Sequence, residues 1–228
     1  MFGLVWHGLV LRNMIFVPGG ITLSLGNTAS FIGLLLGLTG LVISIQPMLR
    51  GVACGLLMLA AVAAIFTGWF AAPPANTAIT WQIEAHILIS LLAYGLLTVG
   101  AIVAVYAIVQ DRRLHAGKLS TVNQLFAPLE TTERLLYGIA AAGFLALLLA
   151  VLSGFVFVDD LFAQHLIHKT VLSLVALLLF GLLLAGRQFA GWRGRRAVSL
   201  YLWGFATLGL AYFGSRYILE QVLGRTWT

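Results

Sequence analysis

The stretch HLIHKTVLSLVALLLFGLLLAGRQFAGWRGRRAVSLYLWGFATLGLAYFGSR, residues 165–216, decides the fold. It contains an apolar run that opens with two histidines, a short basic segment GWRGRR, and a second apolar run that ends at an arginine. Each run approaches the roughly 20 residues with which an α-helix crosses the hydrocarbon core of a bilayer. The stretch therefore predicts two membrane-spanning helices joined by a tight basic loop.

The rest of the chain has the same character. Of its 228 residues, 61% are hydrophobic and only 9% are charged, with a mean hydropathy of +1.03. The apolar runs are continuous and do not alternate with polar residues, which argues against a transmembrane β-barrel. Helices satisfy the backbone hydrogen bonds of each crossing segment. We therefore expect an all-α, polytopic transmembrane helix bundle that forms one domain over residues 1–228.

Proline, glycine and charged residues divide the chain into six expected full spans and one partial helix. The partial helix is MFGLVWHGLVLR at the N-terminus, about three turns long. A polar connector over residues 75–84 and a basic loop over 187–196 separate later spans. The expected full spans cover residues 27–45, 52–71, 86–109, 135–158, 168–186 and 197–217.

Positive charge is concentrated in the loops of one side, and this predicts the orientation. That side is expected to be cytoplasmic, with the C-terminus outside. For the same reason the net charge of +6 is interpreted as topology information, with no nucleic-acid partner. The GWRGRR segment is interpreted as a loop that sets the topology and lies near phospholipid headgroups. Nine of the 13 Lys and Arg residues lie on this side: Arg50, Arg112, Arg113, Lys118, Arg134, Arg187, Arg193, Arg195 and Arg196.

Other residue types narrow the function. Cys54, the single cysteine, excludes an intrachain disulfide and is expected to be buried. Glycines at positions 33, 37 and 40 and over 138–143 predict close helix packing. No Ser-His-Asp, Walker or GxGxxG arrangement occurs in a usable context, so we expect no enzyme activity of the hydrolase or nucleotide-dependent kind.

Four of the five histidines are expected at the outer membrane face. His86 and His168 each begin an inward span, and two crossings separate them. His7 falls near the same face, and His165 precedes His168 by one helical turn. Only His115 lies on the basic side, where we expect a solvated residue.

An ionisable residue at the apolar boundary of a membrane is a functional hypothesis. Two neutral imidazoles, here those of His86 and His168, can ligate a haem iron axially. A zinc site prefers three or four ligands, whereas the pair His165 and His168 supplies two. Each histidine taken alone also fits an interface residue or a helix cap. Glu84 either orients the imidazole of His86 or caps its helix.

Several segments together resemble the CcsA/CcmC-type cytochrome c assembly family, most closely its YpjD-like (HemX-like) branch. The most specific is GWRGRR followed by a span that ends in FGSR, and the resemblance covers nearly the whole chain. The supporting segments are LSLGNTASF at 23–31, EAHILISLLAYGLLT at 84–98, PLETTERLLYGI at 128–139 and the HKT run from residue 168.

The resemblance implies a multi-pass protein of the bacterial inner membrane that handles haem b at the extracytoplasmic face. His86 and His168 match the two extracytoplasmic histidines of the family, and His7 matches a further histidine of the YpjD-like branch. Haem and membrane lipid are the implied partners, together with apocytochrome c or other cytochrome c biogenesis proteins.

The chain departs from the family pattern in three places. The segment FVFVDDLFAQHLIHKT lacks the tryptophans of the family's WWD segment, which restricts the prediction to haem binding rather than delivery. Ala185 stands about where members carry an inner histidine. About one and a half N-terminal helices of the YpjD-like pattern are also lacking, from which we expect a truncated, mis-started or shortened chain.

Two other classes of function stay open from the residues. A small-molecule transporter would need polar groups in the middle of its spans, and these are few. A membrane scaffold or regulator without a cofactor would use the basic inner loops, including Arg193, Arg195 and Arg196, to bind an acidic partner or anionic lipid.

Overall fold

The computed structural model describes residues 2–17, 20–21, 25–67, 80–115, 128–157 and 167–214. Predictions about His165, Lys118 and the FGSR end of the last span concern positions outside these ranges. The elements are α1 (Phe2–Ile15), β1 (Phe16–Val17), β2 (Gly20–Ile21), α2 (Leu25–Ser44), α3 (Arg50–Ile65), α4 (Trp81–His115), α5 (Leu129–Phe157), α6 (Ile167–Ala190) and α7 (Arg195–Gly209).

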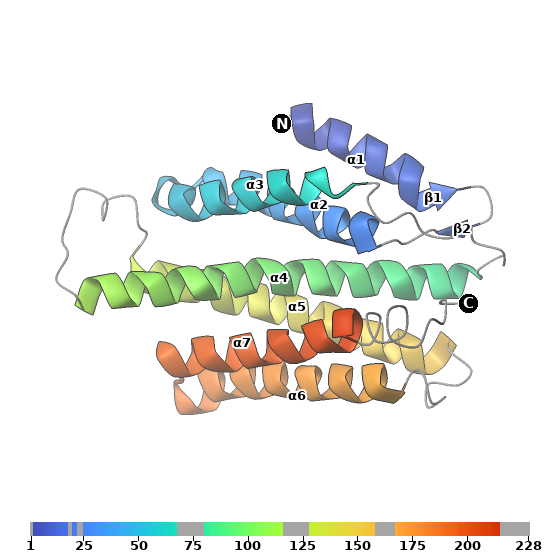
Figure 1. The fold of residues 1–228 in the computed structure, drawn as a ribbon. Coiled ribbons are helices and arrows are strands. Elements are labelled where there is room, and N and C mark those ends of the chain that lie inside the picture. Colours follow the sequence, from blue (N-terminus) through green and yellow to red (C-terminus); the bar gives the residue numbers. More distant parts are fainter. Residues whose placement is uncertain are drawn as a thin grey trace.

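Helix α4 lies at the centre of the bundle (Figure 1). The hairpin of α2 and α3 lies on one side of it, and the hairpin of α6 and α7 lies on the other. Helix α4 packs mainly against α5, α2 and α7, whereas α6 packs mainly against α7 and α5. Helix α1 lies obliquely at the edge and packs on α2, where Leu11 and Ile15 are buried against Phe31 and Leu34. The short strands β1 and β2 pair antiparallel just after it.

The expected membrane bundle is confirmed, since five helices in the described part are long and apolar enough to span. The sixth expected span, 197–217, is helical from Arg195 to Gly214, and its remaining residues lie outside the described ranges. Helix α7 has 15 residues, and a π-helical turn of five residues, Leu210–Gly214, continues it.

Two expected connectors are partly helical instead. Helix α4 begins at Trp81, inside the predicted polar connector, and has 35 residues. At a rise of ~1.5 Å per residue it measures about 52 Å, well beyond the roughly 30 Å of hydrocarbon. The predicted loop 187–196 shrinks because α6 continues to Ala190 and α7 already begins at Arg195. Charged residues here therefore lie on helix ends that extend past the apolar segment.

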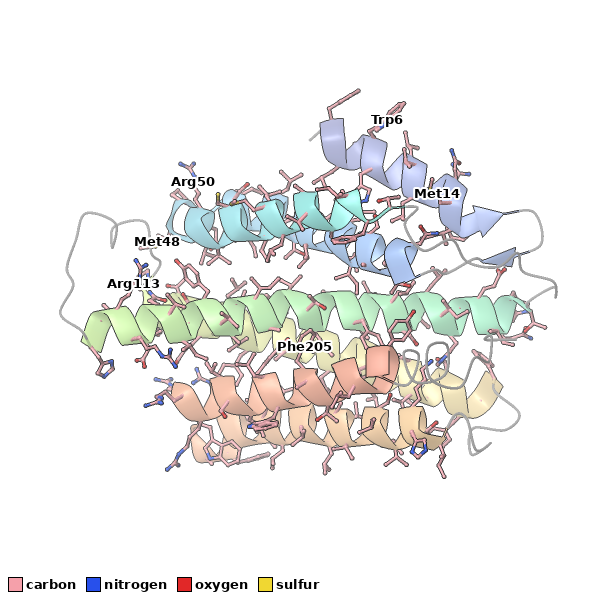
Figure 2. The ribbon with its side chains drawn as sticks, in the orientation of Figure 1. Trp6, Met14, Met48, Arg50, Arg113 and Phe205 are labelled. Atoms are coloured by element: carbon pink, nitrogen blue, oxygen red, sulfur yellow. The ribbon has the colours of Figure 1, made fainter. Side chains whose placement is uncertain are left out.

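Because consecutive spans run in opposite directions, the bundle has two chemically different ends (Figure 1). The first end, called the histidine end, holds the starts of α2, α4 and α6, with His86 and His168. The second end, called the basic end, holds the starts of α3, α5 and α7 and the C-terminal ends of α4 and α6. Figure 2 shows Arg50 and Arg113 together at this basic end.

The core at the centre of α4 depends on a glycine. The Tyr201 ring is fully buried, contacts Phe180 edge-on at 5.1 Å between centroids, and donates a hydrogen bond from its hydroxyl to the Leu97 carbonyl at 2.9 Å. A Cβ placed at Gly100 would overlap this hydroxyl. Such close approach of helices through glycine was predicted for other positions, and it is confirmed at Gly33 and Gly143. Gly138, by contrast, faces open space.

The prediction of a buried cysteine is wrong. Cys54 is exposed on α3. The buried side chains of this helix, Ala53, Leu56 and Ala60, lie on the face that packs against α2. Successive residues of a helix point about 100° apart, so Cys54 turns away from that face.

The turn between α6 and α7 is tied to α5 by hydrogen bonds. Gly191 and Gly194 have φ values of 62° and 61°, which L side chains rarely adopt. The Gly194 amide donates to Glu133 Oε1 at 2.7 Å, and the Tyr137 hydroxyl donates to the Trp192 carbonyl at 2.6 Å. The Arg187 guanidinium lies over the Tyr137 ring, 4.7 Å from its centroid. The basic segment is thus a fixed turn.

Substitution of Gly100 by alanine tests the packing of α7 on α4. The new methyl group would displace the Tyr201 ring and break its bond to Leu97, and we expect a loss of about 1–3 kcal/mol in stability. Gly138→Ala is the matched control, since nothing lies within 4 Å of its added Cβ. Thermal unfolding of the detergent-solubilised protein measures both, and equal midpoints for the two variants would contradict the close approach.

Candidate functional site

The ring of His86 is held by a serine of the neighbouring helix. Its Nδ1 lies 2.9 Å from Ser153 Oγ. The Ser153 hydroxyl donates its only proton to the Ala150 carbonyl, also at 2.9 Å, so its oxygen accepts from Nδ1–H. The proton of the neutral ring is thereby fixed on Nδ1, and Nε2 carries the free lone pair. This is the arrangement in which an outer hydrogen bond orients a metal-binding imidazole.

The half-buried His86 ring packs directly on the α5 backbone. A Cβ at Gly154 would lie 3.1 Å from His86 Cε1, so the glycine lets the ring sit close to α5. Near the same end, the Trp81 and Phe157 rings lie 6.3 Å apart between centroids. The imidazole therefore sits in a partly apolar setting with a defined orientation.

A cation near this histidine also contacts one of a pair of packed tyrosines. The Lys169 ammonium group is 5.7 Å from the centre of the Tyr212 ring and interacts electrostatically with His86. The Tyr212 hydroxyl is hydrogen-bonded to Thr28 Oγ1 at 3.1 Å. The Tyr94 ring lies 5.4 Å from that of Tyr212. Side chains from α2, α4, α6 and the π-helical turn therefore converge at the histidine end.

The π-helical turn Leu210–Gly214 supplies Tyr212 to this group. Such turns widen a helix locally and are often found at functional sites. Because the turn continues α7, it brings the tyrosine into contact with one side chain each of α2, α4 and α6.

His168 lies at the same end but on a different face of α6. Its side chain is exposed. The side chain of the neighbouring Lys169 instead lies over the Tyr212 ring and interacts electrostatically with His86. Helix α6 reaches α4 mainly by way of α5 and α7. In the described residues His86 and His168 thus share an end of the bundle without sharing a pocket.

His7 belongs to a separate chain of hydrogen bonds. Its Nε2 lies 2.6 Å from Ser30 Oγ, which in turn is bonded to Thr67 Oγ1. The Thr67 hydroxyl donates to the Ala64 carbonyl at 2.7 Å, so each hydroxyl accepts from the group before it. The proton of a neutral His7 ring is therefore on Nε2, and Nδ1 is its remaining acceptor. This relay fastens α1 to α2 and α3.

The structure also separates His115 from the other histidines. It is exposed at the C-terminal end of α4, where Nδ1 lies 2.9 Å from the Asp111 carbonyl oxygen. The prediction that His115 is solvated is confirmed, and the residue lies at the end of a helix. Glu84, predicted either to orient His86 or to cap its helix, is not the ring's observed partner, which is Ser153.

Sequence reasoning missed Ser153, Lys169, Thr28 and Tyr212. The indication was present, because isolated Ser, Thr and Lys residues in apolar spans must find partners inside the protein. The spacing of helices along the chain, however, does not specify which helix faces meet. Only the packing of α5 on α4 brings the serine to the imidazole.

Comparison with known proteins bears on this arrangement. The model of a family described as Cytochrome C assembly protein matches residues 2–223. The chain belongs to this cytochrome c assembly family. It is 38% identical over 138 residues to the inner membrane protein YpjD of Escherichia coli (strain K12), an alignment that covers 60% of this chain and 52% of YpjD.

A more distant relative is an uncharacterized 28.8 kDa protein in the nifR3-like 5' region of Azospirillum brasilense. It is 28% identical over 144 residues, which are 62% of this chain and 53% of the relative. The chain therefore spans about half the length of the curated relatives it matches. No solved structure matches it.

The Ser30→Ala variant tests the relay that holds α1. Removing the hydroxyl leaves His7 Nε2 without its acceptor and Thr67 Oγ1 without the donor on its other side, and we expect a loss of about 1–3 kcal/mol in stability. Ser44→Ala is the control in the same helix, because its hydroxyl bonds only within α2, to the Leu41 carbonyl. Thermal unfolding in detergent compares the two, and an equal effect of both variants would refute the relay.

Proposed function

We propose that this protein is a non-catalytic haem-binding protein of cytochrome c assembly in the bacterial inner membrane. The single observation that carries the proposal is the fixed tautomer of His86, whose Nδ1 is bonded to Ser153 and whose Nε2 is left to bind iron. Membership of the cytochrome c assembly family and the similarity to an inner membrane protein support the same assignment.

The donor types at the histidine end are those that a haem site uses, although the described side chains of His86 and His168 do not share a pocket. In the proposal, His86 and His168, both at the histidine end, would hold the haem through neutral imidazoles. Lys169 provides a cation for one of the carboxylates that haem carries, and Tyr94 and Tyr212 provide aromatic surface. Bound haem b would supply an iron centre for one-electron chemistry or would itself be the cargo that is passed on.

His7 enters the proposal in a secondary role. Its match to a histidine of the YpjD-like branch makes it a haem-binding candidate. Because Nε2 is hydrogen-bonded to Ser30, the nitrogen it would offer in this arrangement is Nδ1. A role in positioning α1 over the histidine end is consistent with the relay to Thr67.

The orientation follows from charge. With Arg50, Arg112, Arg187 and Arg195 at the basic end, the positive-inside rule assigns that end to the cytoplasm. The histidine end and the C-terminus are then extracytoplasmic, which is the side where apocytochrome c, the proposed partner, would meet the haem.

Spectroscopy of the full chain purified in detergent from haem-replete cells tests the proposal. We expect a Soret band with the low-spin character of two imidazole ligands. His86→Ala should abolish this spectrum, and His168→Ala should abolish it or leave iron with one protein ligand. The matched control is His115→Ala, at the opposite end, which should leave the spectrum unchanged.

Ser153→Ala separates orientation from ligation. The variant keeps His86 but loses the bond that fixes its tautomer, and we expect haem affinity to fall about 10- to 100-fold. A colourless wild-type protein would refute haem binding altogether. An unchanged spectrum in His168→Ala would remove His168 from the ligand set while leaving His86 in it.

A further inference from the structure

A cleft of about 460 Å³ opens at the basic end, between α4, α5 and α7. It is far from the histidine end and borders the turn between α6 and α7, since Glu133 and Gly194 line it. Its volume falls within the ~300–1,000 Å³ usual for small-molecule sites. The cleft has two chemically distinct parts, an apolar wall and a charged mouth.

The wall follows α7 toward the middle of the bundle. Val198, Leu202 and Ala206 line it on α7, and Ala107 and Ile108 line it on α4. From Arg195 to Ala206 the rise is about 16 Å at ~1.5 Å per residue, which is roughly half of the hydrocarbon thickness. The wall therefore has the length of one leaflet.

The cleft is accessible from the surrounding bilayer. Trp203, which also lines it, is 67% exposed, and the side chains of Ser199 and Ala206 are exposed as well. An apolar surface of this kind, inside the membrane layer, meets acyl chains rather than dissolved solutes.

The mouth carries two arginines and two carboxylates. Arg112 and Arg195 are both exposed and line the cleft. The carboxylate of Glu133 already accepts the Gly194 amide at 2.7 Å, and that of Asp111 lies 3.4 Å from His115 Nδ1. We therefore assign the ligand contact to the guanidinium groups. Guanidinium is the side-chain group that best matches the geometry of phosphate oxygens.

We infer that the cleft binds an anionic phospholipid of the leaflet at the basic end. One acyl chain lies along α7 toward Ala206, and the phosphate contacts Arg112 and Arg195. The arginines concentrated at this end of the bundle favour an anionic headgroup over a zwitterionic one; besides the two in the cleft they include Arg50, Arg134 and Arg196. The inference is independent of the haem proposal, which concerns the opposite end.

Native mass spectrometry of the full chain tests this inference. The delipidated protein is given phosphatidylglycerol and phosphatidylethanolamine in equal amounts. We expect wild type to retain phosphatidylglycerol preferentially, and the double variant Arg112→Gln/Arg195→Gln to lose about tenfold or more of that occupancy. Ala206→Phe, which fills the apolar wall and leaves both arginines in place, should lower occupancy as well.

The matched control is Arg50→Gln/Arg196→Gln, which removes two positive charges from the same end without altering the cleft lining. It should lose much less lipid than the cleft variant does, because both cleft arginines remain in place. The site is refuted if this control loses as much lipid as the cleft variant, or if wild type retains no lipid. Equal retention of phosphatidylethanolamine would overturn the anionic assignment, and wild-type occupancy in Ala206→Phe would overturn the acyl-chain placement.

Discussion

No water is available inside the apolar layer of a membrane, so a polar side chain there must find its partner within the bundle. This constraint fixes the helices relative to one another. His86 bonds to Ser153 at one end of α4, and Thr132 donates to Gln110 Oε1 at 3.3 Å at the other, so α4 and α5 are joined by side-chain bonds at both ends. The Tyr201 hydroxyl joins α7 to the middle of α4. Apolar packing fills the space between these bonds, but it is the bonds that set the rotation of each helix.

The direction of each span was predictable from the sequence, and its rotation was not. Helix breaks at Pro128 and in the GWRGRR segment separate the spans, and consecutive spans run in opposite directions. These two facts are enough to bring His86 and His168 to one end of the bundle and the arginines to the other. Rotation depends on which side chains meet across an interface, such as Gly100 with Tyr201. An apolar span without a polar face does not specify this, since lipid accepts the same residues as a protein core. The wrong prediction for Cys54 has the same cause, because the sequence does not show which face of its helix turns away from the bundle.

The two ends of the bundle differ in how their polar groups are bound. At the histidine end, the hydrogen-bond chains that start at His7 and His86 end on backbone carbonyls, to which Thr67 and Ser153 donate. Each hydroxyl in these chains therefore accepts a hydrogen bond from the imidazole side, which defines the tautomer of each ring. At the basic end, the carboxylate of Glu133 is bound by a backbone amide, and arginines remain exposed. The two ends therefore differ in the groups they present, neutral nitrogen donors at one end and guanidinium groups at the other.

The pair His168 and Lys169 shows why the rotation of α6 matters for function. Adjacent residues on a helix point about 100° apart, so the two side chains cannot both face His86. The structure turns Lys169 toward Tyr212 and His86 and leaves His168 exposed. A haem has two kinds of group to bind, an iron at its centre and carboxylates at its edge. In the proposed haem site, His168 and Lys169 would therefore bind different parts of the ligand, and the rotation of α6 favours the contact of Lys169 with a carboxylate over that of His168 with the iron.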